Sequence, residues 1–270
     1  MGEMDLPAAH MPAACLARHC ASRWMFLDAL RGLALVWMTA FHLCFDLSHL
    51  GFWSQDFYGD PFWTWQRRGI VTLFLLCVGL AQAQVQARAA PAAMPWARWG
   101  RLTACALAVS VASYAMFADS YIYFGVLHCI ALVSLALWRM QRWRDACLLA
   151  VAVPALALPP LYQALGASWP EPLVQMLNGR AGSVLGLVTQ LPPTEDYVPL
   201  LPWLGVAMLG LWAGRQPACR NLAAPAMPQR PATRPLRLLA WLGRHSLPYY
   251  MLHQLVLMGG LMALRAWMPA

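Results

Sequence analysis

Lysine is absent from this sequence of 270 residues, and charged residues of any kind make up only 11% of it. Hydrophobic residues make up 60%, far more than a soluble domain of this size contains. Seven stretches are apolar and long enough to cross a hydrocarbon core of about 30 Å. They lie near residues 29–50, 69–87, 101–118, 121–138, 146–165, 199–214 and 246–267. We therefore predict an all-α polytopic membrane protein with about seven transmembrane helices in a lipid bilayer.

Cysteine pairs with the spacing Cys-x-x-Cys are also absent, and none of the eight cysteines falls in a segment that we expect on the outer side. These absences argue against a zinc site and against structural disulfides, and we expect no metal. Residues 1–22 lack the basic start and unbroken apolar core of a signal peptide, so we predict a cytoplasmic N-terminal tail. A single multi-span domain over 23–270 follows, with a cytoplasmic linker rich in proline and arginine at about 215–237.

The arginines are distributed very unevenly between the two sides of this topology. Fifteen of the 19 fall before or at the start of the first span, or in and next to the segments after the second, fourth and sixth spans. Only Arg67, Arg68, Arg180 and Arg265 fall on the opposite side. Because translocated loops are depleted in basic residues, the N-terminus is expected in the cytoplasm. The net charge of +8 mostly reflects this uneven distribution. Nucleic-acid binding is a poor explanation for it, since the arginines are scattered over short loops and do not gather on one soluble module.

The first apolar stretch carries five ionisable residues, Asp28, Arg31, His42, Asp46 and His49. On a helix that advances 100° per residue, they fall within an arc of about 60°. An ionisable group facing lipid costs roughly 2.5 kcal/mol or more, so this stripe is expected to face the interior of the protein. Asp28 and Arg31 lie near the cytoplasmic end, where mutual pairing explains them as well as a function does.

His42 and Asp46 lie four residues apart, deep in the same span. The carboxylate can therefore accept a hydrogen bond from one imidazole nitrogen and leave the other nitrogen as a base. A purely structural His–Asp pair is the alternative explanation. His49 lies further out, where it can simply sit at the outer interface.

Two other spans carry histidine among apolar residues. His128 follows Tyr121 by seven residues, and His253 follows Tyr249 by four, so each is expected to share a helix face with a polar neighbour. A single histidine of this kind is more often structural than a ligand. Together, however, the three histidine-bearing spans predict a polar centre enclosed by helices.

Arg31 and His42, with ten residues between them, match the arginine–histidine signature of the family-three transmembrane acyltransferases. Four strings resemble more closely the bacterial relatives of heparan-α-glucosaminide N-acetyltransferase. In chain order they are "LDALRGLALVWMTAFHLCFDL", "FGVLHCIAL", "DYVPLLPWLGVAMLGLWAG" and "LGRHSLPYYMLHQ". The resemblance covers nearly the whole chain from residue 23 onward. It implies a multi-span enzyme of the inner (plasma) membrane that takes acetyl, or another short acyl group, from cytoplasmic acetyl-CoA and passes it to a carbohydrate-type acceptor on the far side.

Residue roles follow from this resemblance together with the polar stripe. We expect His42, Asp46 and His49 to be catalytic. The sequence does not decide whether His42 or His49 is the reactive histidine. Contacts with acyl-CoA or acceptor are expected from Asp28, Arg31, His128, Arg244, Tyr249 and His253. The reactive histidine can act as a general base or accept the acyl group covalently, and both routes stay open. The sequence does not decide whether the protein forms a homodimer.

Two other classes of function use the same residues. Histidines within spans can ligate haem, but haem-binding pairs usually recur along the same two helices, whereas His42, His128 and His253 lie on three. A proton-coupled transporter, in which Asp46 and the histidines relay protons at mid-membrane, is the stronger alternative. No internal repeat supports it.

Overall fold

The computed structural model describes residues 24–88, 93–219 and 233–267. The helices are α2 (Met25–His49), α3 (Pro61–Arg88), α4 (Trp96–Met116), α5 (Val126–Arg139), α6 (Asp145–Ala164), α7 (Glu171–Asn178), α8 (Arg180–Ser183), α9 (Trp203–Arg215), α11 (Arg234–Arg244) and α12 (Ser246–Trp267). No strand occurs in these ranges, so the predicted all-α class is confirmed for the described residues. The predicted tail 1–22 lies outside them. The predicted linker 215–237 lies partly outside them, and its last residues already belong to α11.

The predicted number of spans needs correction. Within the described residues, four helices are long and apolar enough to cross a bilayer, namely α2, α3, α6 and α12, which is fewer than the seven predicted. The other three predicted spans contain α4, α5 and α9. Helices α5 and α9 have only 14 and 13 residues, or about 20 Å of helix. Helix α4 has 21 residues but is less apolar, because it carries Arg98, Arg101 and several hydroxyl side chains.

Helices α5 and α9 are short because the chain before each of them is not helical, and the two non-helical segments lie side by side. Phe124 and Tyr197 form a parallel bridge, and the Val198 N–H donates to the Phe124 carbonyl over 3.3 Å. Asp196 Oδ2 accepts a hydrogen bond of 2.9 Å from the Val126 N–H in the first turn of α5. Burial raises the pKa of this carboxyl. The backbone groups of these two segments are thus hydrogen-bonded without forming a helix. Hydrophobicity alone does not predict this arrangement.

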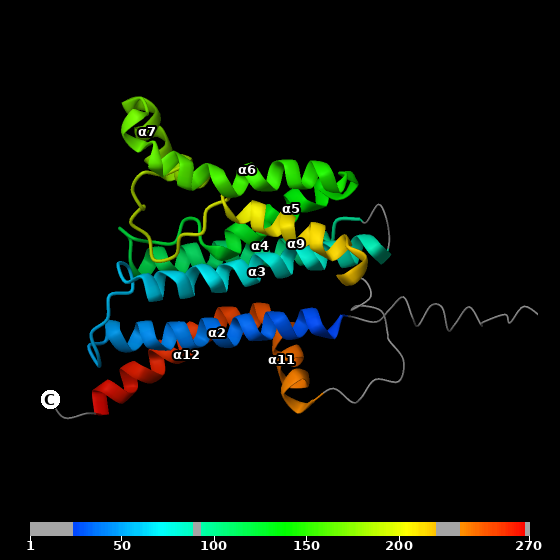
Figure 1. Cartoon of the computed structure of the whole chain (residues 1–270). Coiled ribbons are helices and arrows are strands. Elements are labelled where there is room, and N and C mark those ends of the chain that lie inside the picture. The colour runs from blue at the N-terminus through cyan, green and yellow to red at the C-terminus, as the bar shows by residue number, and fades with distance from the viewer. Residues whose placement is uncertain (1–23, 89–92, 220–232, 268–270) are drawn as a thin grey trace, which may run out of the picture.

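Figure 1 shows α2 and α12 on one side of the molecule, α3 next to α2, and α9, α5 and α6 toward the other side. Two pairs of helices approach so closely that only glycine fits between them. A Cβ on Gly79 of α3 would meet the backbone of α9, and a Cβ on Gly243 of α11 would meet the Asp28 carbonyl of α2. Helix α11 thus packs closely against α2. Because α12 begins two residues after α11 ends, its start lies beside α2.

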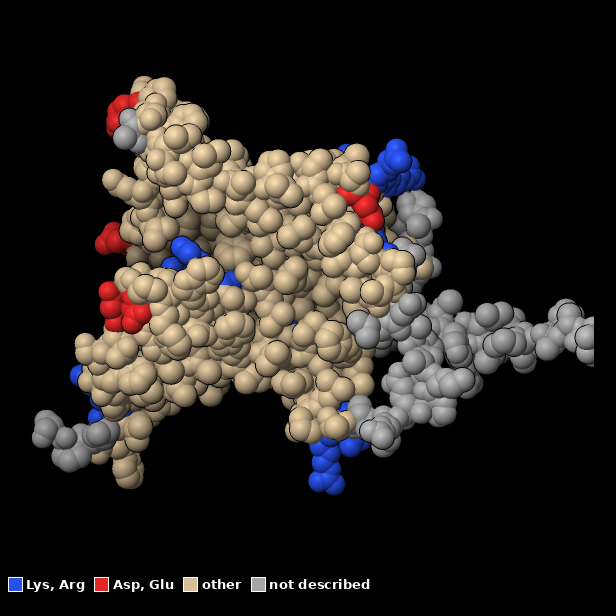
Figure 2. All heavy atoms as spheres, viewed as in Figure 1, with Lys and Arg blue, Asp and Glu red and all other residues tan. Residues whose placement is uncertain are grey.

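The surface is consistent with a bilayer as solvent. Figure 2 shows the charged side chains mostly at the two ends of the helices, with a wide uncharged belt between them. Large apolar side chains such as Val153, Leu255 and Val256 are exposed on this surface. An apolar surface of this extent on helices of spanning length marks contact with lipid.

Candidate active site

The ionisable stripe of α2 faces the interior, as predicted, except at its outer end. Asp28 and Asp46 are buried, and Arg31 and His42 are partly buried. His49 is exposed, with its ring stacked near Phe45 at 6.2 Å between centroids. The inward-facing stripe therefore ends at Asp46.

Helix α12 lies beside the outer part of this stripe and contacts α2 at three levels. Near the middle of α2, the Thr39 hydroxyl lies 2.7 Å from the Tyr249 hydroxyl. One turn on, the His42 and His253 rings lie 5.2 Å apart. These contacts advance together along both helices, so α2 and α12 run in the same direction. A polar seam between two spanning helices results. It brings together two of the three histidines of the predicted polar centre, His42 and His253, whereas His128 contacts Ser110 and Gly125 instead.

Asp46, at the third level, has a partner that was not predicted. Its Oδ1 accepts a hydrogen bond of 2.8 Å from the Gln254 side-chain amide, and its Oδ2 is buried without a partner. The expected hydrogen bond with His42 does not occur in the described structure. Asp46 is fully buried, and the nearest donor comes from α12 rather than from its own helix. The carboxylate is therefore joined to α12 at Gln254, the residue that follows His253.

His253 is held by its own helix. Its Nδ1 lies 2.7 Å from the Tyr250 carbonyl, and because a carbonyl only accepts, Nδ1 carries the proton. Nε2 is buried without a hydrogen-bond partner. The Tyr249 ring lies parallel to the imidazole, with 6.0 Å between centroids and 7° between planes. The predicted neighbour relation between Tyr249 and His253 is thereby confirmed.

His128 has a different environment from the other two histidines. Its Nδ1 accepts from the Gly125 N–H over 3.2 Å, so Nε2 carries the proton and can donate to the Ser110 hydroxyl, also at 3.2 Å. His128 therefore caps α5 and joins it to α4. The expected shared face with Tyr121 is wrong, because Tyr121 precedes the first residue of α5.

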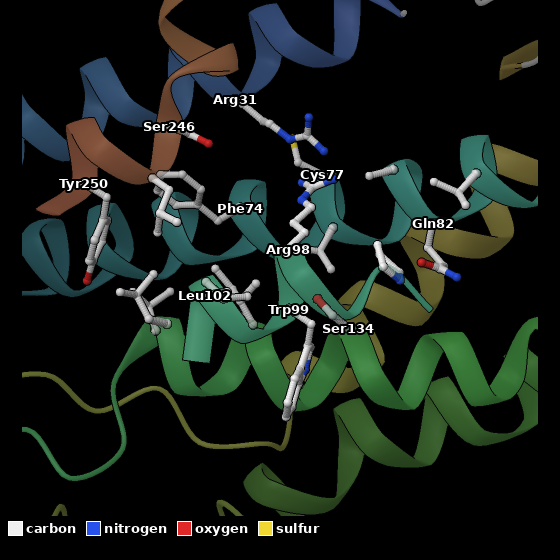
Figure 3. Close-up of a pocket in the computed structure, with 18 of the residues that line it drawn as sticks. Arg31, Phe74, Cys77, Gln82, Arg98, Trp99, Leu102, Ser134, Ser246 and Tyr250 are labelled. Carbon is white, nitrogen blue, oxygen red and sulfur yellow. The ribbon is translucent and has the colours of Figure 1, made fainter. Parts of the chain in front are cut away.

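A cavity of about 210 Å³ lies between α2, α3, α4, α5 and α12 (Figure 3). Most of its lining is apolar, and the polar part includes two guanidinium groups, Arg31 from α2 and Arg98 from α4. Met94 and Pro95, in the connection before α4, also line it, so the cavity reaches the end of the bundle that we predict to be cytoplasmic. At the other end lie Tyr250 and residues from the start of α5. A long ligand with an anionic group at one end fits such a lining.

Arg31 is oriented by Asp28, whose Oδ1 lies 3.1 Å from the Arg31 guanidinium one turn away. The predicted pairing is confirmed, and Arg31 nevertheless lines the cavity. Structural and binding roles are thus compatible for this pair. Arg244 is exposed at the end of α11, two residues before Ser246 of the cavity lining, and its predicted contact with acyl-CoA stays a prediction.

Sequence reasoning missed three residues of this region: Arg98, Tyr250 and Gln254. Gln254 carried a usable signal, because a polar side chain in an apolar span needs a partner inside the protein. Arg98 precedes the predicted third span and was counted only for charge. Tyr250 contributes its side chain to the cavity and its carbonyl to His253, a combination that only the fold reveals.

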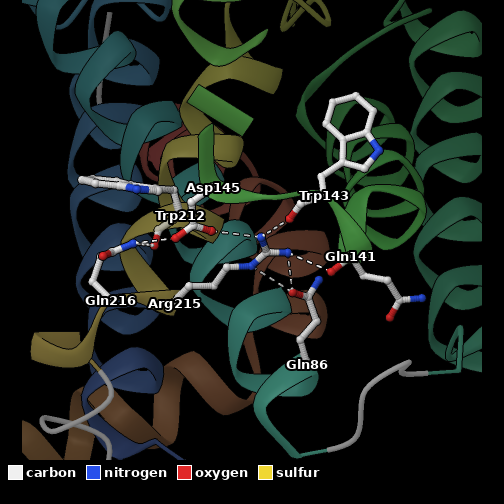
Figure 4. Close-up of polar contacts among 7 residues, drawn as sticks. All are labelled: Gln86, Gln141, Trp143, Asp145, Trp212, Arg215 and Gln216. Atoms are coloured by element: carbon white, nitrogen blue, oxygen red, sulfur yellow. Dashed lines mark hydrogen bonds and ion pairs between the residues drawn. The ribbon is translucent and has the colours of Figure 1, made fainter. Parts of the chain in front are cut away.

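A second polar cluster, at the ends of α3, α6 and α9, is explained by structure alone (Figure 4). The Arg215 guanidinium donates to Gln86 Oε1 at 2.9 Å, to the carbonyls of Gln141 and Trp143 at 3.0 and 2.8 Å, and to Asp145 Oδ1 at 3.2 Å. These acceptors belong to α3, to α6 and to the turn before α6. Arg215 therefore joins the ends of these helices, and its guanidinium donates to acceptors within the protein.

Comparison with known proteins identifies the family. Residues 23–255 match the model of the family described as heparan-alpha-glucosaminide N-acetyltransferase, catalytic. Neither the curated proteins nor the solved structures gave a match. The matched range includes α2, the cavity and the seam up to Gln254 and one residue beyond, so it contains the whole candidate site. This chain, a membrane protein of apolar helices, therefore belongs to the heparan-alpha-glucosaminide N-acetyltransferase catalytic family of acyltransferases.

Proposed function

We propose that this protein transfers an acetyl or other short acyl group from cytoplasmic acyl-CoA to a sugar-type acceptor at the outer face of the inner membrane. Family membership supports an acetyltransferase-type membrane enzyme, and the family in general uses acetyl-CoA as donor. The donor, the acceptor class and the direction of transfer are our inferences for this chain. They rest on the cavity, the histidine pair and the distribution of arginines.

The observation that carries the proposal is that α2 and α12 both contribute to the cavity and to the histidine pair. On α2, Arg31 lines the cavity and His42 lies about 16 Å further along the helix. On α12, Tyr250 lines the cavity while its carbonyl holds His253. Phosphate held by Arg31 and Arg98 would place the pantetheine arm along the apolar lining, with the thioester directed toward the seam.

His42 is the residue that we assign to the reaction, since it lies inside the seam and His49 is exposed outside it. In direct transfer, His42 takes the proton from the acceptor hydroxyl or amine. The acceptor atom then forms a bond with the acyl carbon, the carbon–sulfur bond breaks, and the proton passes to the thiolate. In the covalent route, the His42 nitrogen bonds to the acyl carbon as the carbon–sulfur bond breaks and the thiolate leaves. The acceptor then bonds to the acyl carbon as the carbon–nitrogen bond breaks, and the acceptor's proton passes to the thiolate.

The remaining residues support this chemistry in our proposal. Asp46 positions the seam through Gln254, and Asp28 orients Arg31. Tyr249 fixes the His253 ring from one side. His128 shapes the cavity indirectly, because it caps α5, and Val126, Leu127 and Ile130 of α5 line the cavity.

Reconstitution into vesicles with acetyl-labelled acetyl-CoA tests the proposal. We expect label to become covalently attached to an amino sugar such as glucosamine, and desulfo-CoA, which lacks the thioester sulfur, to inhibit by competing for the cavity. Accumulation of unmodified sugar across the membrane without acetylation would instead indicate a transporter. Failure of desulfo-CoA to bind the purified protein would remove the proposed donor site.

A further inference from the structure

His253 is an exception on its own helix. Among the residues Ser246–Trp267, all of which the structure describes, it is the one that is buried, with 8% of its surface exposed. Its neighbours Leu252 and Leu255 are 57% and 67% exposed on the apolar surface. A helix that buries a single side chain ordinarily buries an apolar one, because polar groups lose hydration on burial.

The hydrogen bonding of the His253 ring makes the exception more specific. Nδ1–H donates to the Tyr250 carbonyl, which fixes the tautomer and leaves the Nε2 lone pair available. That lone pair is buried without a hydrogen-bond partner. An imidazole nitrogen with a free lone pair is a proton acceptor, so Nε2 can receive a proton without first losing a hydrogen bond.

The contacts around His253 hold its ring beside one other histidine, His42. Tyr249 lies parallel to the ring, and its hydroxyl is bonded to Thr39, so the ring plane is held from two helices. The His42 ring lies 5.2 Å away across the seam. Gln254, the next residue on α12, is bonded to Asp46 and holds the two helices in register at this level.

We propose that His253 is the proton-exchanging partner of His42, an inference that rests on the proposed acyl transfer. When His42 takes the proton from the acceptor, its other ring nitrogen can pass a proton to His253 Nε2. The acceptor atom bonds to the acyl carbon as the carbon–sulfur bond breaks. The proton then returns from His253 through His42 to the thiolate, so that overall one proton moves from acceptor to sulfur and both histidines end neutral.

The test uses the full-length protein in vesicles and three variants. His253→Asn keeps a side-chain N–H for the Tyr250 carbonyl but has no basic nitrogen in place of Nε2. His253→Ala opens a cavity that small heterocycles can fill. His245→Asn is the matched control, because His245 Nδ1 lies 2.9 Å from the Trp241 carbonyl but the residue is exposed at the end of α11.

We expect His253→Asn to bind desulfo-CoA within about twofold of wild type and to transfer acyl groups about 100-fold more slowly, while His245→Asn changes neither. Added imidazole should restore transfer by His253→Ala at least tenfold, whereas pyrazole, which has the same ring shape but is a far weaker base, should not.

Three results would overturn the role. They are transfer by His253→Asn within threefold of wild type, equal rescue by pyrazole and imidazole, and a loss of desulfo-CoA binding that alone accounts for the lost transfer. A wild-type protein that binds desulfo-CoA and transfers acyl groups keeps the proposed function in each of these cases. A wild type that does neither removes both proposals.

Discussion

Asp46 and Gln254 are joined across α2 and α12 by a hydrogen bond of 2.8 Å, in which the glutamine amide donates to Oδ1. Asp46 is fully buried, and Gln254 directly follows His253. The bond therefore anchors α12 to a buried carboxylate of α2, directly beside the place where the His42 and His253 rings face each other. Together with the Thr39–Tyr249 contact, this bond aligns α12 with α2.

Replacing Gln254 by leucine should destabilise the protein and lower its activity. Asp46 would lose its donor while staying buried, which costs about 1–3 kcal/mol. We expect a lower unfolding midpoint in detergent and reduced acyl transfer. Gln163→Leu is the control, because Gln163 is an exposed glutamine on α6 with only a 3.5 Å contact to the Val188 carbonyl. Equal midpoints for the two variants would show that the Asp46 contact contributes no stability.

The sequence does not decide which of the two histidines of α2, His42 or His49, is the reactive one. Replacing each of them should have different effects. His42→Ala should reduce transfer at least 100-fold while insertion and desulfo-CoA binding persist, because the loss of a general base ordinarily costs that much. His49→Ala should keep most of the activity, since His49 is exposed. Retention of more than about a tenth of wild-type turnover by His42→Ala, together with a collapse in His49→Ala, would move the reactive residue to His49.

Arg31 and Arg98 should govern donor affinity. If their contacts with phosphate are equally good in ground and transition states, then alanine at either position raises the KM for acyl-CoA about tenfold or more and leaves kcat nearly unchanged. Arg101→Ala serves as control, because Arg101 is exposed on α4 and contacts its own helix at Ala97. An unchanged KM in both cavity variants would exclude phosphate binding at this end.

Arg215 should matter for stability and not for donor affinity. Its replacement by alanine removes the donor to four acceptors on α3, on α6 and in the turn before α6, so we expect a loss of about 3 kcal/mol or more. Arg142→Ala is the matched change on the same end of the bundle, with an exposed side chain. Thermal unfolding in detergent checks this. A lower midpoint with Arg142→Ala than with Arg215→Ala would contradict the assignment.

The inward face of α2 could be predicted from the sequence, because the cost of ionisable groups in lipid leaves only one orientation for the stripe. The partner of Asp46 could not, since helical spacing pointed to His42 and the donor proved to be Gln254, 208 positions away in the chain. His128 shows the same limit, because its role as a cap depends on where α5 begins.

The number of spans went wrong for a comparable reason. The apolar runs at 121–138 and 199–214 are long enough to span, yet the first residues of each run are not helical. The bridge between Phe124 and Tyr197 and the bond from Val126 to Asp196 satisfy the backbone there. Hydrophobicity reports whether a segment is buried and does not report whether its hydrogen bonds lie within one helix or between two segments.

The central claim is that the acyl group enters from the cytoplasmic face and leaves on the other. Vesicles of known orientation, with acetyl-labelled acetyl-CoA on one face and an amino sugar on the other, measure this directly, and an impermeant thiol reagent at Cys219 reports which face carries that residue. We predict acetylated sugar only when acetyl-CoA is on the face of Cys219 and the sugar on the face of Glu195. Transfer that requires acetyl-CoA on the Glu195 face, or that proceeds only with both substrates on one face, would contradict the account.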